Sequence, residues 1–132
     1  MTRKHYPAWW RRRLRGAAAE GTMSELASAL TSNDEDVLRE MLHPDVVVII
    51  DSGGFVPHAA EPAEGPAAAT SQLLSLMTSD TSVAMASINS VPGFTLIRGG
   101  QVVGAVTAEE RSGLLSSVWV VCNPDKLRHW NR

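Results

Sequence analysis

Cysteine is almost missing from this chain, which carries one thiol, Cys122, among its 132 residues. A single cysteine excludes a disulfide framework within the chain and suits a reducing compartment. The four histidines share no spacing typical of metal ligands, and the glycine-rich loops that bind phosphates and dinucleotides are missing. We therefore expect no metal site and no cofactor.

Long apolar runs are also missing. No stretch approaches the roughly 20 apolar residues that a helix needs to cross a bilayer. Residues 11–13 are all arginine, but the segment after them is not the apolar stretch that a twin-arginine signal requires. We therefore expect a cytoplasmic protein that does not associate with membranes, built as one domain with a real core.

Acidic residues are missing from the first 15 positions, which hold six of the twelve basic side chains. The rest of the chain has six basic and fourteen acidic side chains. A basic arm on an acidic body can contact nucleic acid or an acidic protein surface, whereas a solvated terminus needs no partner. We treat residues 1–21 as a basic arm or helix extension and expect no nucleic-acid contact outside it.

Two short helices are expected in the first third of the chain. Residues 22–25 read as a capping box that precedes one apolar stripe, and residues 32–35 read as a second capping box. The second helix should end at His43-Pro44. The inward side chains predicted for the first helix are Met23, Leu26, Ala27 and Leu30, and those for the second are Val37, Leu38, Met41 and Leu42.

The middle of the chain predicts a strand, a loop and a helix. Residues 46–50 are apolar without alternation, which is typical of a strand covered on both faces. Residues 57–66 hold three prolines and one glycine and read as a loop. Pro66 suits the first position of a helix, which we expect to run to about residue 78.

The last third predicts antiparallel strands. We expect strands over 82–90, 94–98, 101–107 and 114–122, with a break at 91–93 and a turn over 109–113. Gly99-Gly100 is a favoured two-residue hairpin turn. Helices followed by such a run of strands indicate an α+β fold, with a curved sheet packed on helices.

Two short motifs carry a family resemblance. The apolar strand 46–50 ends in Asp51-Ser52-Gly53-Gly54, and the last strand ends in Asn123-Pro124-Asp125-Lys126-Leu127. Residues 22–132 thereby resemble the SnoaL-like domain at the C-terminus of one group of extracytoplasmic-function sigma factors. That domain typically has an Asp-Gly-Gly-Gly turn, matched here except for Ser52, and an Asn-Pro-Asp-Lys-Leu end motif, matched in full.

The resemblance implies the nuclear-transport-factor-2-like (NTF2-like) cone, a curved antiparallel sheet packed on three helices. That fold serves isomerases, cyclases, hydratases, transport factors and dimerisation modules, so it does not decide function. In the sigma-factor relatives this domain is a C-terminal extension thought to regulate the sigma core in cis. Only some 20 residues precede it here, so we expect a free-standing domain rather than a complete sigma factor.

Asp51 allows two interpretations. An acid at this place is the proton-abstracting base of ketosteroid-isomerase-like relatives, and His58 could pair with it across a cavity mouth. Alternatively, Asp51 accepts hydrogen bonds from the backbone of Gly53 and Gly54 in an Asx-type turn. The sequence favours the turn, because the relatives' catalytic tyrosine and second acid have no counterpart in the matched region. Trp119, on the last strand, is a core residue, a pocket wall or part of a dimer face.

The C-terminal tail is the candidate partner-binding segment. Pro124 can open a final helical turn capped by Asn123, which would place Leu127 and Trp130 on one face. That face either packs on the domain's own core or docks on a partner. The predicted partner-binding residues are Asn123, Pro124, Asp125, Lys126, Leu127, Arg128 and Trp130.

The sequence thus predicts a non-catalytic domain that binds a protein partner, such as a sigma factor, or a small apolar ligand inside its cone. We also expect a homodimer formed through the sheet. A small isomerase or cyclase with Asp51 as base, and a purely structural dimerisation module, remain the alternatives.

Overall fold

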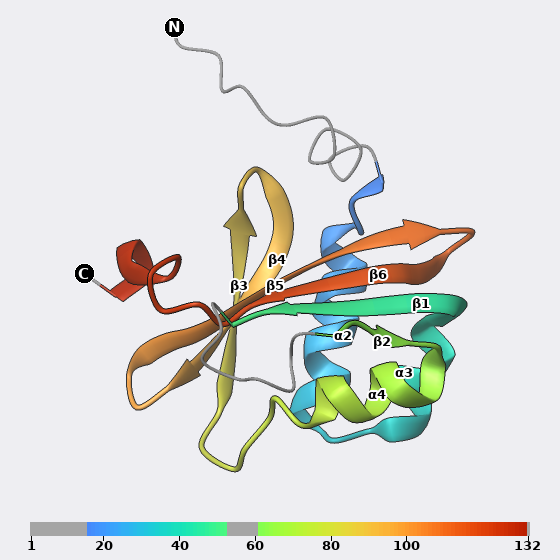
Figure 1. The fold of residues 1–132 in the computed structure, drawn as a ribbon, viewed down its shortest axis with the longest axis horizontal. Coiled ribbons are helices and arrows are strands. Elements are labelled where there is room, and N and C mark those ends of the chain that lie inside the picture. The colour runs from blue at the N-terminus through green and yellow to red at the C-terminus, as the bar shows by residue number, and fades with distance from the viewer. Residues whose placement is uncertain (1–15, 53–60, 132) are drawn as a thin grey trace, which may run out of the picture.

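The computed structural model describes residues 16–52 and 61–131 (Figure 1). Their order of helices and strands is the predicted α+β arrangement, except that a short strand lies within the predicted 57–66 loop and that the second helix ends at Met41, before His43-Pro44. Most of the proposed basic arm lies outside the described residues. The elements are α2 (Glu20–Thr31), α3 (Glu35–Met41), β1 (Leu42–Asp51), β2 (Ala63–Glu64), α4 (Pro66–Leu74), β3 (Ser82–Ile88), β4 (Val91–Arg98), β5 (Gln101–Arg111), β6 (Leu114–Val121) and the 3₁₀ helix η2 (Arg128–Asn131).

The described strands form one sheet in the order β2-β1-β6-β5-β4-β3. Neighbours pair antiparallel, as predicted, except that β1 and β6 are parallel. In that pair Val48 lies opposite Val118 and Asp51 lies opposite Val121. Both strands end at the same edge of the sheet. The two sequence motifs therefore begin side by side, the first at Asp51 and the second just after Val121.

One face of the sheet carries the hydrophobic core. Helices α2, α3 and α4 pack against it, and Phe94, Leu26 and Leu73 are fully buried between the two layers. Strand β1 is covered unequally, because Val46 and Val48 are buried while Val47 and Ile49 are only half-buried. The expectation of a strand covered on both faces was therefore wrong. We call the helix-covered side the inner face and the opposite side the outer face.

The apolar stripe of the first helix is confirmed, but its predicted start is not. Helix α2 begins at Glu20, and Ala19, its N-cap residue, donates its backbone N–H to the Oε1 atom of Glu110 at 3.1 Å. A carboxylate from β5 thus satisfies one backbone donor at the start of this helix, and the predicted capping box does not form the start. In α3 the cap is Asp34, which accepts a hydrogen bond from the backbone N–H of Val37.

Two further helix predictions need correction. Val37 was expected to point inward, but it is 42% exposed, and Leu38 alone among the α3 residues is buried. Pro66 opens α4 as predicted, but this helix ends at Leu74 rather than near residue 78.

The Gly99-Gly100 hairpin turn is confirmed, and the last turn lies within the predicted 109–113 segment but is shorter, whereas the break predicted at 91–93 lies elsewhere. The β3–β4 turn is Asn89-Ser90, and the 91–93 segment belongs to β4. Strand β5 continues to Arg111 before a turn at Ser112-Gly113. In all three hairpins the two turn residues have positive φ, as tight two-residue turns between twisted strands require.

Gly93 lies close to the backbone of β5. A Cβ atom at this position would lie 2.4 Å from the backbone oxygen of Val106, so only glycine allows this approach. Strand β4 pairs with β5 from Phe94 onward, and the segment before α2 lies beside the rest of β5, with the Ala18 N–H bonded to the Ala108 oxygen at 2.9 Å. Strands β3 and β4 run across the direction of β1 and β6 (Figure 1).

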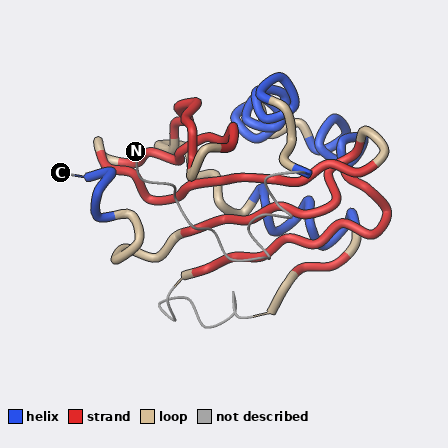
Figure 2. The backbone as a smooth tube through the Cα atoms, turned by 90° about the horizontal axis from the view of Figure 1, so that it is seen from above, coloured by secondary structure: helices blue, strands red, loops and turns tan. Residues whose placement is uncertain are grey.

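The helices and the C-terminal tail lie at opposite ends of the molecule. Figure 2 shows α2, α3 and α4 toward one end and the tail with η2 at the other. The tail therefore stands apart from the helical layer that covers the inner face.

Candidate functional site

The two sequence motifs meet at the edge of the sheet where β1 and β6 end. The backbone N–H of Cys122 donates to the backbone oxygen of Asp51 at 2.7 Å. The Nζ atom of Lys126 lies 2.5 Å from the Oδ2 atom of Asp51. The acid of the first motif is thus ion-paired with the lysine of the second.

Asp51 faces away from the helices. Side chains alternate along a strand, and the buried inner-face residues of β1 are Val46 and Val48, so Asp51 follows the outer register with Val47 and Ile49. Its partner Lys126 belongs to a tail that packs in the outer-face cluster. The carboxylate is therefore positioned to hold the tail and does not face the core between sheet and helices.

The Asn-Pro break makes a compact turn. The backbone oxygen of Asn123 accepts the N–H groups of Lys126 at 3.0 Å and of Leu127 at 3.1 Å. The Asn123 side-chain oxygen accepts the N–H of Asp125 at 3.1 Å, so Asn123 caps this turn as predicted. The regular helical turn follows later, over residues 128–131, as η2.

Leu127 and Trp130 anchor the tail on the domain itself. Leu127 is 3% exposed and packs with Ile88 and Ala105, and Trp130 is half-buried against the same cluster. Of the two possibilities that the sequence left open, the structure shows this face packed on the chain's own sheet.

Asn131 completes the attachment. Its Oδ1 atom accepts the backbone N–H of Val102 at 2.7 Å, and its Nδ2 atom donates to the Val102 oxygen at 3.0 Å. Strand β6 stops at Val121, opposite Ala105, so the β5 residues before Ala105 have no partner from β6. One amide side chain supplies the two hydrogen bonds that a neighbouring strand would supply. Sequence reasoning missed Asn131, because nothing local marks this contact across the sheet.

A cleft of about 420 Å³ lies between the tail and the β3–β4 turn. Its floor includes the outer-face cluster of Ile88, Ala105 and Leu127. Trp130 and the turn residue Ser90 are among its other lining residues. The cavity predicted from the sequence was placed elsewhere, between the sheet and the helices.

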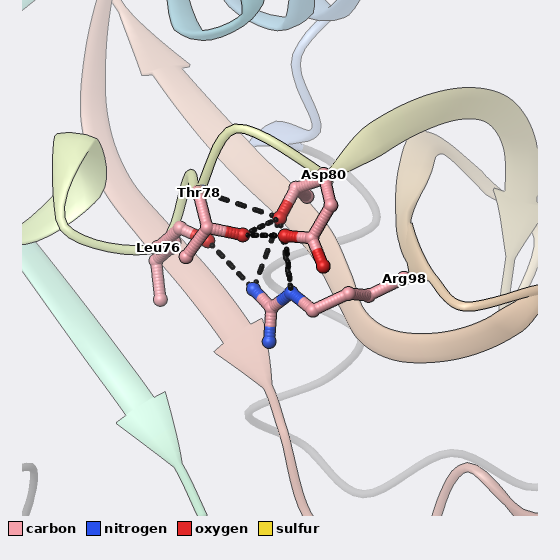
Figure 3. A network of polar contacts seen from close by, with 5 residues as sticks. Leu76, Thr78, Asp80 and Arg98 are labelled. Atoms are coloured by element: carbon pink, nitrogen blue, oxygen red, sulfur yellow. Dashed lines mark hydrogen bonds and ion pairs between the residues drawn. The ribbon is translucent and has the colours of Figure 1, made fainter.

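A second polar network fixes the loop between α4 and β3 (Figure 3). Arg98 donates to the Thr81 hydroxyl from Nε at 3.1 Å and from Nη2 at 3.0 Å, and to the Leu76 backbone oxygen at 3.3 Å. The hydroxyl of Thr78 donates to Asp80, and this bond, with the charge of Arg98, lowers the pKa of the Asp80 carboxyl. The sequence analysis did not single out this network.

Cys122 lies near this end of the sheet but is poorly suited to nucleophilic chemistry. Burial raises the pKa of its thiol, and the charge of Asp51 adds to this effect, while that of Arg98 acts against it. A protonated, largely buried thiol is a weak nucleophile.

The remaining candidates are only partly placed. Trp119 is half-buried on the outer register of β6, between Ile49 and Thr107. Gly53, Gly54 and His58 lie outside the described residues, so the Asx-type turn and the Asp51–His58 pair remain predictions. In the described part of the chain, no group of three metal-ligating side chains comes together. No helix there is long and apolar enough to span a bilayer.

The comparisons with known proteins bear on the fold. No family model matches the chain, and no curated protein sequence matches it. Among solved structures, the extracytoplasmic-function sigma factor SigJ of Mycobacterium tuberculosis is similar, with a TM-score of 0.66 at 23% identity over 89% of this chain. This chain spans 47% of the SigJ chain, about half its length.

Two further structures match at lower identity. An LEH-like epoxide hydrolase of M. tuberculosis has a TM-score of 0.53 at 16% identity, over 85% of this chain and 87% of that one. An NTF2-like protein from Cytophaga hutchinsonii has a TM-score of 0.54 at 13% identity, over 81% of this chain and 91% of that one. With three helices on one face of a curved six-stranded sheet in its described part, the chain has the NTF2-like fold.

Proposed function

We propose that this chain is a non-catalytic regulatory domain, related to the C-terminal domains of sigma factors, that binds a protein partner through its docked tail. The ion pair between Asp51 and Lys126 carries the proposal. In this pair Asp51, the best catalytic candidate, holds the tail in place. The pair also joins the two motifs on which the resemblance to sigma-factor domains rests.

The isomerase alternative fits this geometry less well. A general base must have its carboxylate free to reach the proton that it abstracts from the substrate. Asp51 has an ammonium group at 2.5 Å and follows the outer register of β1. Nearby inner-face positions are filled by Val48 and Val120, each 1% exposed.

The structure divides the predicted partner-binding residues into two groups. Leu127 and Trp130 anchor the tail, so they act by holding its shape. Pro124, Asp125 and Arg128 are exposed, and the Arg128 guanidinium lies 2.7 Å from the Asp125 carboxylate. Arginine is enriched among residues that dominate binding energy, so we place the contact surface on this exposed ridge.

The likeness to SigJ supports a sigma-type partner and a cytoplasmic location, where that partner would work. The single free thiol in the described part of the chain fits a reducing compartment. We retain the proposed homodimer through the outer face, with Trp119 at its centre.

A charge swap tests the partner surface without removing the internal ion pair. The double variant Asp125→Lys, Arg128→Glu keeps opposite charges in contact but reverses the ridge that a partner meets. Its matched control is Glu35→Lys, Arg39→Glu on α3, another exposed pair, 3.2 Å apart, on a helix at the other end of the molecule. The full-length chain is used as bait in an extract of its own organism, and captured proteins are identified by mass spectrometry.

We expect the wild type and the α3 control to capture the same sigma factor, and the tail swap to lose it at unchanged melting temperature. Capture of the same partner by the tail swap contradicts the proposed surface. If the wild type captures no sigma-type protein, the proposed partner is wrong.

The enzyme alternative has its own assay. We expect no isomerisation of a β,γ-unsaturated ketosteroid above the buffer rate, and no difference between wild type and Asp51→Asn. Turnover by the wild type that disappears in Asp51→Asn would establish Asp51 as a base and overturn the non-catalytic proposal.

A further inference from the structure

The cleft beside the tail is large enough for a small molecule. Its volume of about 420 Å³ lies within the roughly 300–1,000 Å³ of typical ligand pockets. Buried apolar side chains of Ile88, Ala105 and Leu127 form part of its floor. Trp130 and His129, whose ring centroids lie 5.1 Å apart, add an aromatic side. Such a surface favours a flat, apolar ring system.

The charge of the cleft is unusual for this acidic body. Its described lining includes Lys126 and His129 and no acidic residue. Two other cavities of the described chain have acids in their lining, Glu20 in one and Glu25 with Asp34 in the other. An ammonium group has three N–H donors, and the Lys126 side chain is 61% exposed although it is paired with Asp51. The cleft can therefore receive an anionic group.

The rim of the cleft is conformationally strained. Among the three hairpin turns of the described chain, Asn89-Ser90 alone has no glycine. Ser90 has φ of 72°, where the corresponding residues of the other turns are Gly100 at 76° and Gly113 at 79°. A serine at such a φ is disfavoured, and residues held in such conformations cluster at functional sites. Ser90 lines this cleft, so a residue with a strained backbone lies at its rim.

We propose that this outer-face cleft binds a small planar aromatic carboxylate, with the ring against Trp130 and the apolar floor and the carboxylate toward Lys126 and the Ser90 rim. The site lies on the sheet face opposite the helices, outside the cone interior. It does not depend on the partner surface proposed above.

The probe is 2-naphthoate, titrated into the full-length chain and followed by backbone amide shifts in two-dimensional NMR. We expect saturable shifts at residues 87–90 and 126–130. The uncharged analogue 2-naphthalenemethanol should bind at least about tenfold more weakly, since the loss of one charge-assisted hydrogen bond is worth about that factor.

Two variants with matched controls locate the site. Trp130→Ala should weaken 2-naphthoate binding about tenfold, whereas Met85→Ala, which truncates an exposed apolar side chain outside the described lining of the cleft, should not. Ser90→Gly relieves the strained φ and removes the short hydroxymethyl side chain, so we expect it to keep the fold. It should weaken binding about threefold, and Ser112→Gly, at another positive-φ serine, should leave binding unchanged.

Binding that Ser90→Gly and Trp130→Ala both weaken, with both controls unchanged, supports the site. The proposal is overturned if the wild type shows no saturable shifts at these residues. It is also overturned if the alcohol binds as well as the carboxylate, or if Ser90→Gly and Ser112→Gly bind alike. If Trp130→Ala fails to fold, the comparison of 2-naphthoate binding by Ser90→Gly and Ser112→Gly tests the site by itself.

Discussion

The two faces of the sheet are built differently. The inner face is covered by three helices and buries large side chains such as Phe94, Leu96 and Leu115 completely. The outer face has a small buried cluster, Ile88, Ala105 and Leu127, and a short tail covers it at one end of the sheet. The inner face thus supplies most of the apolar burial that stabilises the fold, and the outer face is where side chains are available for other work.

This difference gives the two sequence motifs a common purpose. Both follow strands whose inner sides are filled, and both direct their charged residues to the outer side, where Asp51 and Lys126 pair. Asp51 and the second motif therefore attach the tail to the sheet and shape its surface, rather than line the interior of the cone.

The largest expected effect is on the oligomeric state, because we propose that a second copy of the chain covers the rest of the outer face. We expect a homodimer that buries on the order of 1,200–2,000 Å² through the half-exposed region around Trp119 and Ile49. Trp119→Lys should then give a monomer, because an unpaired charge at the centre of an interface is costly. Met85→Lys, on the edge strand β3 at 42% exposure, is the control and should stay dimeric. Light scattering measures the mass, and a wild-type monomer at micromolar concentration contradicts the prediction.

Equal truncations on the two faces compare their contributions to stability. Leu26 is 0% exposed under the helices, and Leu127 is 3% exposed under the tail. We expect Leu26→Ala to lower the free energy of unfolding by about 3–4 kcal/mol. Leu127→Ala should lower it by only about 1–2 kcal/mol, because a short tail can shift to close the space. Urea unfolding measures both, and equal losses would show that the outer cluster is as rigid as the core.

The amide clamp between the tail and β5 should have a smaller effect. Asn131→Ala removes two hydrogen bonds to the backbone of Val102 and should cost about 1 kcal/mol of unfolding free energy. Arg128→Ala, which breaks only an exposed pair with Asp125, should cost less than about 0.5 kcal/mol. Hydrogen exchange at Val102 should accelerate in the first variant alone, and unchanged protection there would mean that the clamp does not form in solution.

Much of the fold could be predicted from the sequence because its signals are local. Pro66 opens a helix, Gly99-Gly100 closes a hairpin, and the stripe from Met23 to Leu30 is buried. The errors arose where a partner distant in the chain decides the structure. Glu110 accepts the Ala19 N–H at the start of α2, and Gly93 lies against β5 within a strand where a break was expected.

The site was harder to predict than the fold. The sequence singled out Asp51 and Lys126 separately, but their pairing depends on β1 and β6 being parallel neighbours, which no local pattern reveals. Leu127 was recognised as apolar, yet whether it faced a partner or its own sheet required the structure. Asn131 and Ser90 were missed, because an amide at a chain end and a serine in a turn are ordinary until their surroundings are known.

The structural role of Asp51 is tested most directly by a double-mutant cycle of Asp51→Ala and Lys126→Ala, measured as free energies of unfolding in urea. The account predicts that the two residues stabilise each other by about 0.5–1 kcal/mol, the upper range for a pair that is partly exposed to solvent. The double variant should then lose less than the sum of the two single losses. Strictly additive losses would contradict the account, because Asp51 and Lys126 would then not be paired in solution and Asp51 would be free for another role.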